Sequence, residues 1–236
     1  MISFFLSAIL ALITPAAEKA LPAACEQLVV VKTGDWNHTR GTLSGYYKVN
    51  GKWEKAFTSF SIVVGRSGLA WGNGLQPESW TKGKIKKEGD GNAPAGIFPL
   101  TRLFSYAGIT SKLRSIKVDD HTFCVDDTAS ANYNRIVNTD TLSKNWTSAE
   151  TMRLKTDGYK YGIVVAYNTE TPVAGNGSCI FMHIWKDNAS PTAGCTAMTE
   201  RNMLRLIAFL DKTKYPLLVQ LPAHTYKKYR GEYGLP

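Results

Sequence analysis

The sequence predicts a mainly β domain with a few helices. Short runs rich in β-branched and aromatic residues recur along the chain, and Gly, Asn and Asp separate them. Hydrophobic residues make up 44% of the 236 residues, and the mean hydropathy is -0.19, so a sizeable core can form. Charged residues make up only 20%, which differs from the composition of disordered chains. The length is compatible with one domain.

The expected elements follow from local patterns. The segment 200–212 has the best helical periodicity, because Met203, Leu206, Ile207 and Leu210 recur at helical spacing, with Thr199 as a plausible N-cap. A second, weaker helix is expected at 148–155. Strands are expected at 27–32, 45–49, 57–64, 122–125, 162–166, 178–185 and 217–221.

The N-terminus is typical of a secretory signal. The apolar run 2–13 is too short to span a bilayer, and small residues suited to an export peptidase follow it. Its first residues contain no Lys or Arg, and a buried helix is the alternative. A lipidated Cys25 is a further alternative, but Pro22 does not fit that motif. We therefore expect residues 1–20 to be a removed signal, with an uncertain cleavage site. Residues 21–236 then form one periplasmic or secreted domain with no membrane contact.

The charge favours an anionic partner. The chain has 28 basic and 19 acidic residues, a formal net charge of +9. The basic residues are mostly dispersed, as on an ordinary solvated surface, and no nucleic-acid motif accompanies them. Export makes a nucleic-acid partner still less plausible.

The segment 177–198, GSCIFMHIWKDNASPTAGCTAM, carries the candidate chemistry. In a strand at 178–185, His183 shares a face with Phe181 and Trp185. The polar loop 186–193 can fold back and bring Cys195 near that face. A thiol attacks as thiolate and needs a base nearby, for which His183 is the closest candidate. Because His183 precedes Cys195, the order differs from that of papain-like enzymes.

The same segment resembles the L,D-transpeptidase catalytic domain, or YkuD, family in a branch with a PTAGC motif. Thr192, Gly194 and Cys195 match the family's Ser/Thr-His-Gly-Cys signature, whereas Ala193 replaces its His and Thr196 replaces its following Asn or Arg. The loop after His183 is also shorter than usual. The resemblance covers about residues 26–222 and includes the blocks 63–74, 86–100, 124–137 and 146–152.

This resemblance implies a β-sandwich or barrel and a cysteine enzyme acting on peptidoglycan stem peptides without a cofactor. Cys195 is the expected nucleophile and His183 its base, held by a backbone carbonyl. Gly194 and Thr192 are expected to position the thiol and supply the oxyanion site. A thioester forms, and an amine from a second stem then resolves it into a cross-link. Hydrolysis of stem peptides or wall-protein linkages is the alternative, and a non-catalytic wall-binding module is the second. We expect a monomer.

Three other residues are candidate substrate contacts. Arg135 can grip a stem-peptide carboxylate bidentately, with Asn134 beside it, although both also suit a surface turn. Trp185 suits either the core or the rim of a site.

The four cysteines allow several pairings. With Cys195 free as the reactive thiol, Cys25–Cys124 is the expected disulfide, and Cys179 is a small buried residue. A zinc site at Cys179, His183 and Cys195 is not expected, because no paired C-x-x-C supports it.

Overall fold

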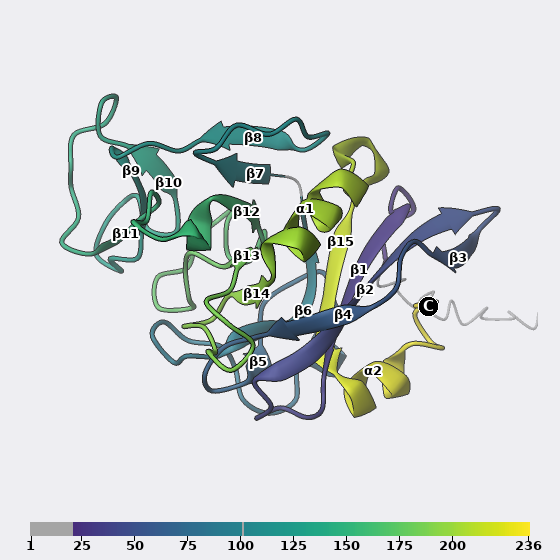
Figure 1. The fold of residues 1–236 in the computed structure, drawn as a ribbon. Helices are drawn as coiled ribbons and strands as arrows, with labels where there is room; N and C mark the ends of the chain where they lie inside the picture. Colours follow the sequence, from purple (N-terminus) through teal and green to yellow (C-terminus); the bar gives the residue numbers. More distant parts are fainter. Residues whose placement is uncertain (1–20, 101) are drawn as a thin grey trace, which may run out of the picture.

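The computed structural model describes residues 21–100 and 102–236, which are arranged around one long, curled β-sheet (Figure 1). The strand order is β5-β6-β15-β1-β2-β4-β14-β13-β12-β7-β8, and β3 pairs with β2. The predicted signal segment 1–20 lies outside the described residues. The strands of this sheet are β1 Gln27–Thr33, β2 Arg40–Val49, β3 Lys52–Lys55, β4 Phe60–Val63, β5 Leu69–Trp71, β6 Ala93–Pro99, β7 Arg102–Ser105, β8 Arg114–Lys117, β12 Tyr161–Val164, β13 Phe181–Ile184, β14 Thr196–Met198 and β15 Leu217–Pro222.

The centre of the sheet is covered on both faces. Strand β1 is almost wholly buried between antiparallel β2 and parallel β15, and β15 is buried throughout. Near-continuous apolar runs are typical of strands in this position. Helix α2, Ala223–Tyr229, packs on β15 and β1, whereas helix α1, Glu200–Phe209, packs on β12 and β13 (Figure 1).

The mainly β prediction is confirmed, and so is the principal helix. The Thr199 hydroxyl accepts a hydrogen bond from the Asn202 amide and caps α1 as expected. The helix ends at Phe209 because Leu210 has an extended backbone. Helix α2 was not expected from the sequence.

A second sheet of three strands lies beyond β7 and β8 (Figure 1). Its order is β10-β9-β11, with β9 Thr122–Val125, β10 Ile136–Asn138 and β11 Ala149–Thr151. The helix predicted at 148–155 is therefore wrong. Ala149–Thr151 pairs antiparallel with β9, and tertiary pairing overrides the modest helical propensity of this segment.

Two hydrophobic clusters fill the interior. The larger one lies along β1, β2, β6 and β15. The smaller one contains Phe104, Tyr159, Phe181 and Cys195, next to the three-stranded sheet. No helix among the described residues is long and apolar enough to cross a membrane.

Candidate active site

Two neighbouring parallel strands bring the candidate residues together. Strand β13 pairs with β14 so that His183 lies opposite Ala197. Cys195 directly precedes β14, and the loop between the strands folds back as the sequence predicts. Phe181 belongs to the smaller cluster and Met182 to the larger one, so the strand alternates as expected.

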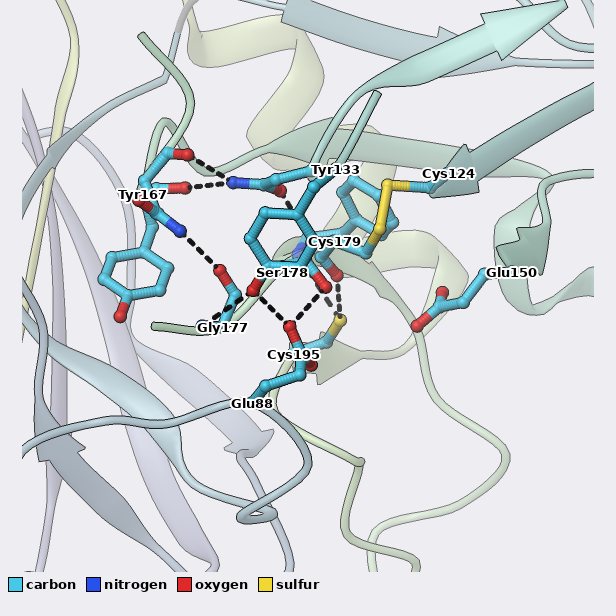
Figure 2. The surroundings of a disulfide bond; sticks show 12 residues. Glu88, Cys124, Tyr133, Glu150, Tyr167, Gly177, Ser178, Cys179 and Cys195 are labelled. Carbon is cyan, nitrogen blue, oxygen red and sulfur yellow. Dashed lines mark hydrogen bonds between the residues drawn. A yellow bond between two sulfur atoms is a disulfide. The ribbon is translucent and has the colours of Figure 1, made fainter. Parts of the chain in front are cut away.

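The Cys195 thiol is buried against backbone groups. Only 6% of the residue is exposed. Its Sγ accepts a hydrogen bond from the Phe181 amide at 3.3 Å and lies 3.6 Å from the Cys179 carbonyl oxygen (Figure 2). The strand that carries His183 therefore also fixes the thiol.

The surroundings favour the neutral thiol. Burial, followed by the negative charge of Glu150, raises the pKa of Cys195 to about 12. The Phe181 amide, the Lys86 charge and the Tyr159 hydroxyl act in the opposite direction. A base or a change of surroundings on substrate binding is needed to form the thiolate.

His183 is held by backbone carbonyls. Its Nδ1 lies 2.8 Å from the carbonyl oxygen of Ile184. A carbonyl can only accept, so Nδ1 carries the proton and Nε2 is left as the basic atom. Burial lowers the pKa of His183, against the effect of the Ile184 and Gly158 carbonyls, which keeps the imidazole neutral at neutral pH.

Tyr159 is close to both candidate catalytic residues. Its ring makes an edge contact with the His183 imidazole at a centroid distance of 5.1 Å. Its hydroxyl donates to Glu150 at 2.7 Å, and the same hydroxyl lowers the pKa of the Cys195 thiol. In the described part of the chain, no hydrogen bond joins His183 directly to Cys195, and Tyr159 contacts the surroundings of both.

Glu150 is a half-buried carboxylic acid that lines the same cavity as Cys195. Burial raises its pKa to about 7, and the charges of Asp126 and Glu88 act in the same direction, whereas the Tyr159 hydroxyl lowers it. Its charge therefore changes near neutral pH, next to Cys195. A carboxyl group with this pKa in a cavity is typical of functional sites.

Thr192 and Gly194 shape the turn that presents Cys195. The Thr192 hydroxyl donates to the Cys195 carbonyl at 2.6 Å and accepts from the Gly194 amide at 3.1 Å. A side chain at Gly194 would place its Cβ 3.0 Å from the Asn92 carbonyl oxygen, so the close approach favours glycine. The Gly194 amide is thus occupied, whereas no hydrogen bond from the Cys195 amide is found within residues 21–100 and 102–236. The Cys195 amide is the more suitable oxyanion donor.

Cys195 opens onto a cavity of about 170 Å³. Its walls are unusually rich in charge, and its lining residues are Arg66, Lys86, Glu88, Gly89, Asp126, Glu150, Ser178, Cys179, Ile180, Ala193, Gly194 and Cys195. Glu88 is fixed by the hydroxyls of Tyr133 and Ser178, as Figure 2 shows. Both signs of charge face this cavity, as a ligand with ammonium and carboxylate groups requires.

The predicted disulfide is wrong. Cys124 on β9 pairs with Cys179, not with Cys25, and the bond ties the three-stranded sheet to the segment before β13 (Figure 2). Cys25 is instead buried in the larger core, where burial raises the pKa of its thiol to about 11. The pairing brings Cys179 to the cavity wall, where its carbonyl contacts Cys195.

The three candidate substrate contacts lie away from the Cys195 cavity. The Asn134 amide group donates to the carbonyls of Tyr167 and Asn168 and accepts from the Cys179 amide, so it braces the disulfide segment. Arg135 lines a separate cavity. Trp185 is half-buried, and its amide donates to Met198.

Sequence reasoning missed the charged residues of the cavity. Arg66, Lys86, Glu88, Asp126 and Glu150 all belong to the four blocks that carry the resemblance. These blocks are far apart in sequence and meet only at Cys195. The convergence of such blocks on one cavity is the signal that would have identified them.

A buried thiol just before β14 and a neutral imidazole on the paired strand β13 thus lie beside a charged cavity. Comparison with protein families matches residues 29–219 to YkuD, the L,D-transpeptidase catalytic domain. The chain therefore belongs to the L,D-transpeptidase catalytic domain family.

Two solved structures are also similar in part. They are the helical cell shape determining protein Pgp2 from Campylobacter jejuni, with a TM-score of 0.42, and a mutant of it, with a TM-score of 0.40. Each is 15% identical over 84% of this chain. The chain covers 48% and 47% of those proteins, about half their length. No curated protein sequence matches the chain.

Proposed function

We propose that this protein is a cysteine-dependent L,D-transpeptidase that joins peptidoglycan stem peptides through a thioester on Cys195. The observation that carries the proposal is the Cys195 thiol at the wall of a charged cavity, just before the strand that pairs with that of His183, in a chain of this family. The mixed charge of the cavity suits a stem peptide, which has both carboxylates and amines.

In the proposed first step, the Cys195 sulfur bonds to a stem-peptide carbonyl carbon and its proton passes to Nε2 of His183. The Cys195 amide donates to the oxygen that becomes negative. The protonated His183 then gives its proton to the leaving amine as the carbon–nitrogen bond breaks. An amine of a second stem attacks the thioester and releases the thiol.

The timing of proton transfer follows from the two pKa values. Burial raises the pKa of Cys195 to about 12 and lowers that of His183, so a completed proton transfer is strongly unfavourable in the resting geometry. Transfer is therefore coupled to attack on the carbonyl. Removal of His183 should slow thioester formation by about 10²–10⁴-fold.

The expected location fits this substrate. Residues 1–20 act as an export signal, and residues 21–236 form the catalytic domain, working as a monomer in the periplasm or outside the cell. The Cys124–Cys179 disulfide is consistent with an oxidising compartment.

Mass spectrometry of purified muropeptides incubated with the protein tests the proposal. New cross-linked dimers, with loss of an amine-bearing fragment, are expected from the parent protein and not from Cys195→Ala. Cys25→Ala is the matched control, because it removes the other free buried thiol and should leave the products unchanged.

Other products would revise the assignment. Shortened monomers alone would make the protein a stem-peptide hydrolase. Cross-linking by Cys195→Ala would refute the thioester mechanism, and unchanged muropeptides with every variant would favour a non-catalytic wall-binding role.

A further inference from the structure

A larger cavity, separate from that of Cys195, lies where β7 and β8 meet the segment 134–137 and the loop 166–170. Its volume is about 520 Å³, and three arginines line it: Arg102, Arg114 and Arg135. None of the residues that line the Cys195 cavity belongs to it. We call it the arginine cavity.

The fold holds these arginines together. Arg102 on β7 lies directly opposite Arg114 on the parallel strand β8. Burial lowers the pKa of the Arg102 guanidinium, and the charges of Arg114 and Arg135 lower it further. Within residues 21–100 and 102–236, no carboxylate lies within salt-bridge distance of any of the three.

This arrangement is unfavourable in the empty protein. Arg102 is half-buried and lies next to Arg114, which is exposed like Arg135, so three like charges repel one another and the half-buried one also loses part of its hydration. A ligand with carboxylate groups would relieve both effects, because a guanidinium binds a carboxylate bidentately.

The other polar side chains that line the arginine cavity indicate which kind of ligand fits it. Glu170 and the hydroxyl-bearing Thr169 and Tyr215 also line the cavity. Glu170 would repel a simple anion such as phosphate, but it can accept hydrogen bonds from an ammonium group. The set of three guanidinium groups and one carboxylate therefore matches a zwitterion with more carboxylates than amines.

The shape indicates an extended ligand. A second hollow of about 280 Å³ adjoins the arginine cavity and shares Pro99, Ala166, Thr169, Glu170 and Tyr215 with it. Asn134, whose amide oxygen holds the Cys179 amide, also lines the arginine cavity. Asn134 thus connects the arginine cavity to Cys179, whose carbonyl contacts the Cys195 thiol.

We propose that the arginine cavity is a second ligand site, which binds a short acidic peptide through its carboxylates while Glu170 receives its amine. The choice of a peptidoglycan stem as this peptide rests on the proposed function. The site then holds a second stem, apart from the one whose carbonyl Cys195 attacks.

Isothermal titration calorimetry tests the proposal, with the purified protein carrying Cys195→Ala to prevent turnover. The probe is a stem tripeptide that ends in diaminopimelate. Adding Arg114→Gln or Arg135→Gln should weaken binding by at least about tenfold, the loss expected for one charge-assisted hydrogen bond. Arg153→Gln is the control, because this exposed arginine pairs with Asp120 elsewhere and its loss changes the net charge equally.

Thermal unfolding distinguishes binding from a structural role. Without peptide, Arg114→Gln should keep or raise the Tm, since it removes a repulsion, and the rise in Tm on adding peptide should shrink. A fall in Tm without peptide, or tripeptide affinity equal in all variants, would overturn the proposal. Phosphate that binds as tightly as the tripeptide would also overturn it, because the site would then be a simple anion site.

The two proposals fail in different ways. In one case, the tripeptide binds in a way that depends on the arginines while the parent protein, with Cys195 intact, produces no new muropeptides. That result would support the second site and refute the proposed enzyme activity. Cross-linking that Arg114→Gln leaves unaltered, together with unaltered tripeptide binding, would refute the second site alone.

Discussion

Glu150→Gln should change how stability depends on pH. Burial raises the pKa of this carboxyl group from its ordinary 4.5 to about 7, so the folded protein holds a proton that the unfolded chain releases. Below pH 4.5 both states are protonated, and the carboxyl group has no net effect. Between pH 4.5 and 7 the unfolded chain ionises first, and stability falls as pH rises.

The magnitude follows from that difference. Each pKa unit corresponds to about 1.4 kcal/mol, so the buried charge costs about 3 kcal/mol of unfolding free energy above pH 7. Glutamine has nearly the same shape and can still accept from Tyr159, but it does not ionise. The variant should therefore be about 3 kcal/mol more stable than the parent at pH 8 and nearly equal to it at pH 4.

Urea denaturation of both proteins at pH 4, 6 and 8 measures this difference. Glu54→Gln is the matched control, because Glu54 also accepts from a tyrosine, Tyr47, but is exposed. A difference between Glu150→Gln and the parent that is the same at all three pH values would refute the reasoning. Iodoacetamide labelling should also show a lower pKa for the Cys195 thiol in Glu150→Gln, because the Glu150 charge raises it.

Three further outcomes are expected. Replacing Cys124 and Cys179 together by alanine should lower the unfolding free energy by about 4 kcal/mol in urea, since the bond closes a 55-residue separation, whereas Cys25→Ala should not change the response to reductant. Thr192→Val keeps the side-chain shape but loses both turn hydrogen bonds, so kcat should fall about tenfold or more and the unfolding free energy by about 1–3 kcal/mol; an unchanged kcat would contradict the positioning role. Thr199→Ala should cost about 1 kcal/mol of stability, measured by urea denaturation, and leave kcat unchanged.

Local patterns were sufficient where local physics decides the structure. The helix after Thr199 and the strand Thr122–Val125 follow from capping and side-chain composition. The helix predicted at 148–155 was wrong because this segment pairs with β9, a contact between residues far apart in sequence that local patterns do not indicate. The β13–β14 pair was anticipated only as a loop folding back, since a sequence does not state which strands become neighbours.

The residues of the candidate site also fall into two groups, those that a local motif predicts and those that only tertiary packing brings together. His183 lies on β13 and Cys195 directly precedes the paired strand β14, which agrees with a loop that folds back between them. The closeness of Tyr159 to both residues is not visible in the sequence, because it depends on the turn Asp157–Tyr159 packing against β13. The sequence analysis named Arg135 as a candidate contact by itself. Arg102 and Arg114 become its neighbours only through the pairing of β7 with β8, which the sequence does not predict.

The disulfide has a consequence for how the chain matures. Synthesis proceeds from the N-terminus, so Cys25 and Cys124 are both made before Cys179, and under the proposed export they can meet an oxidant first. Cys25 lies two residues before β1, which pairs with the next strand along the chain, and we expect that early hairpin to help bury Cys25 away from oxidants. We therefore expect that oxidation before β1 and β2 have paired would favour a Cys25–Cys124 bond and leave Cys179 free beside Cys195.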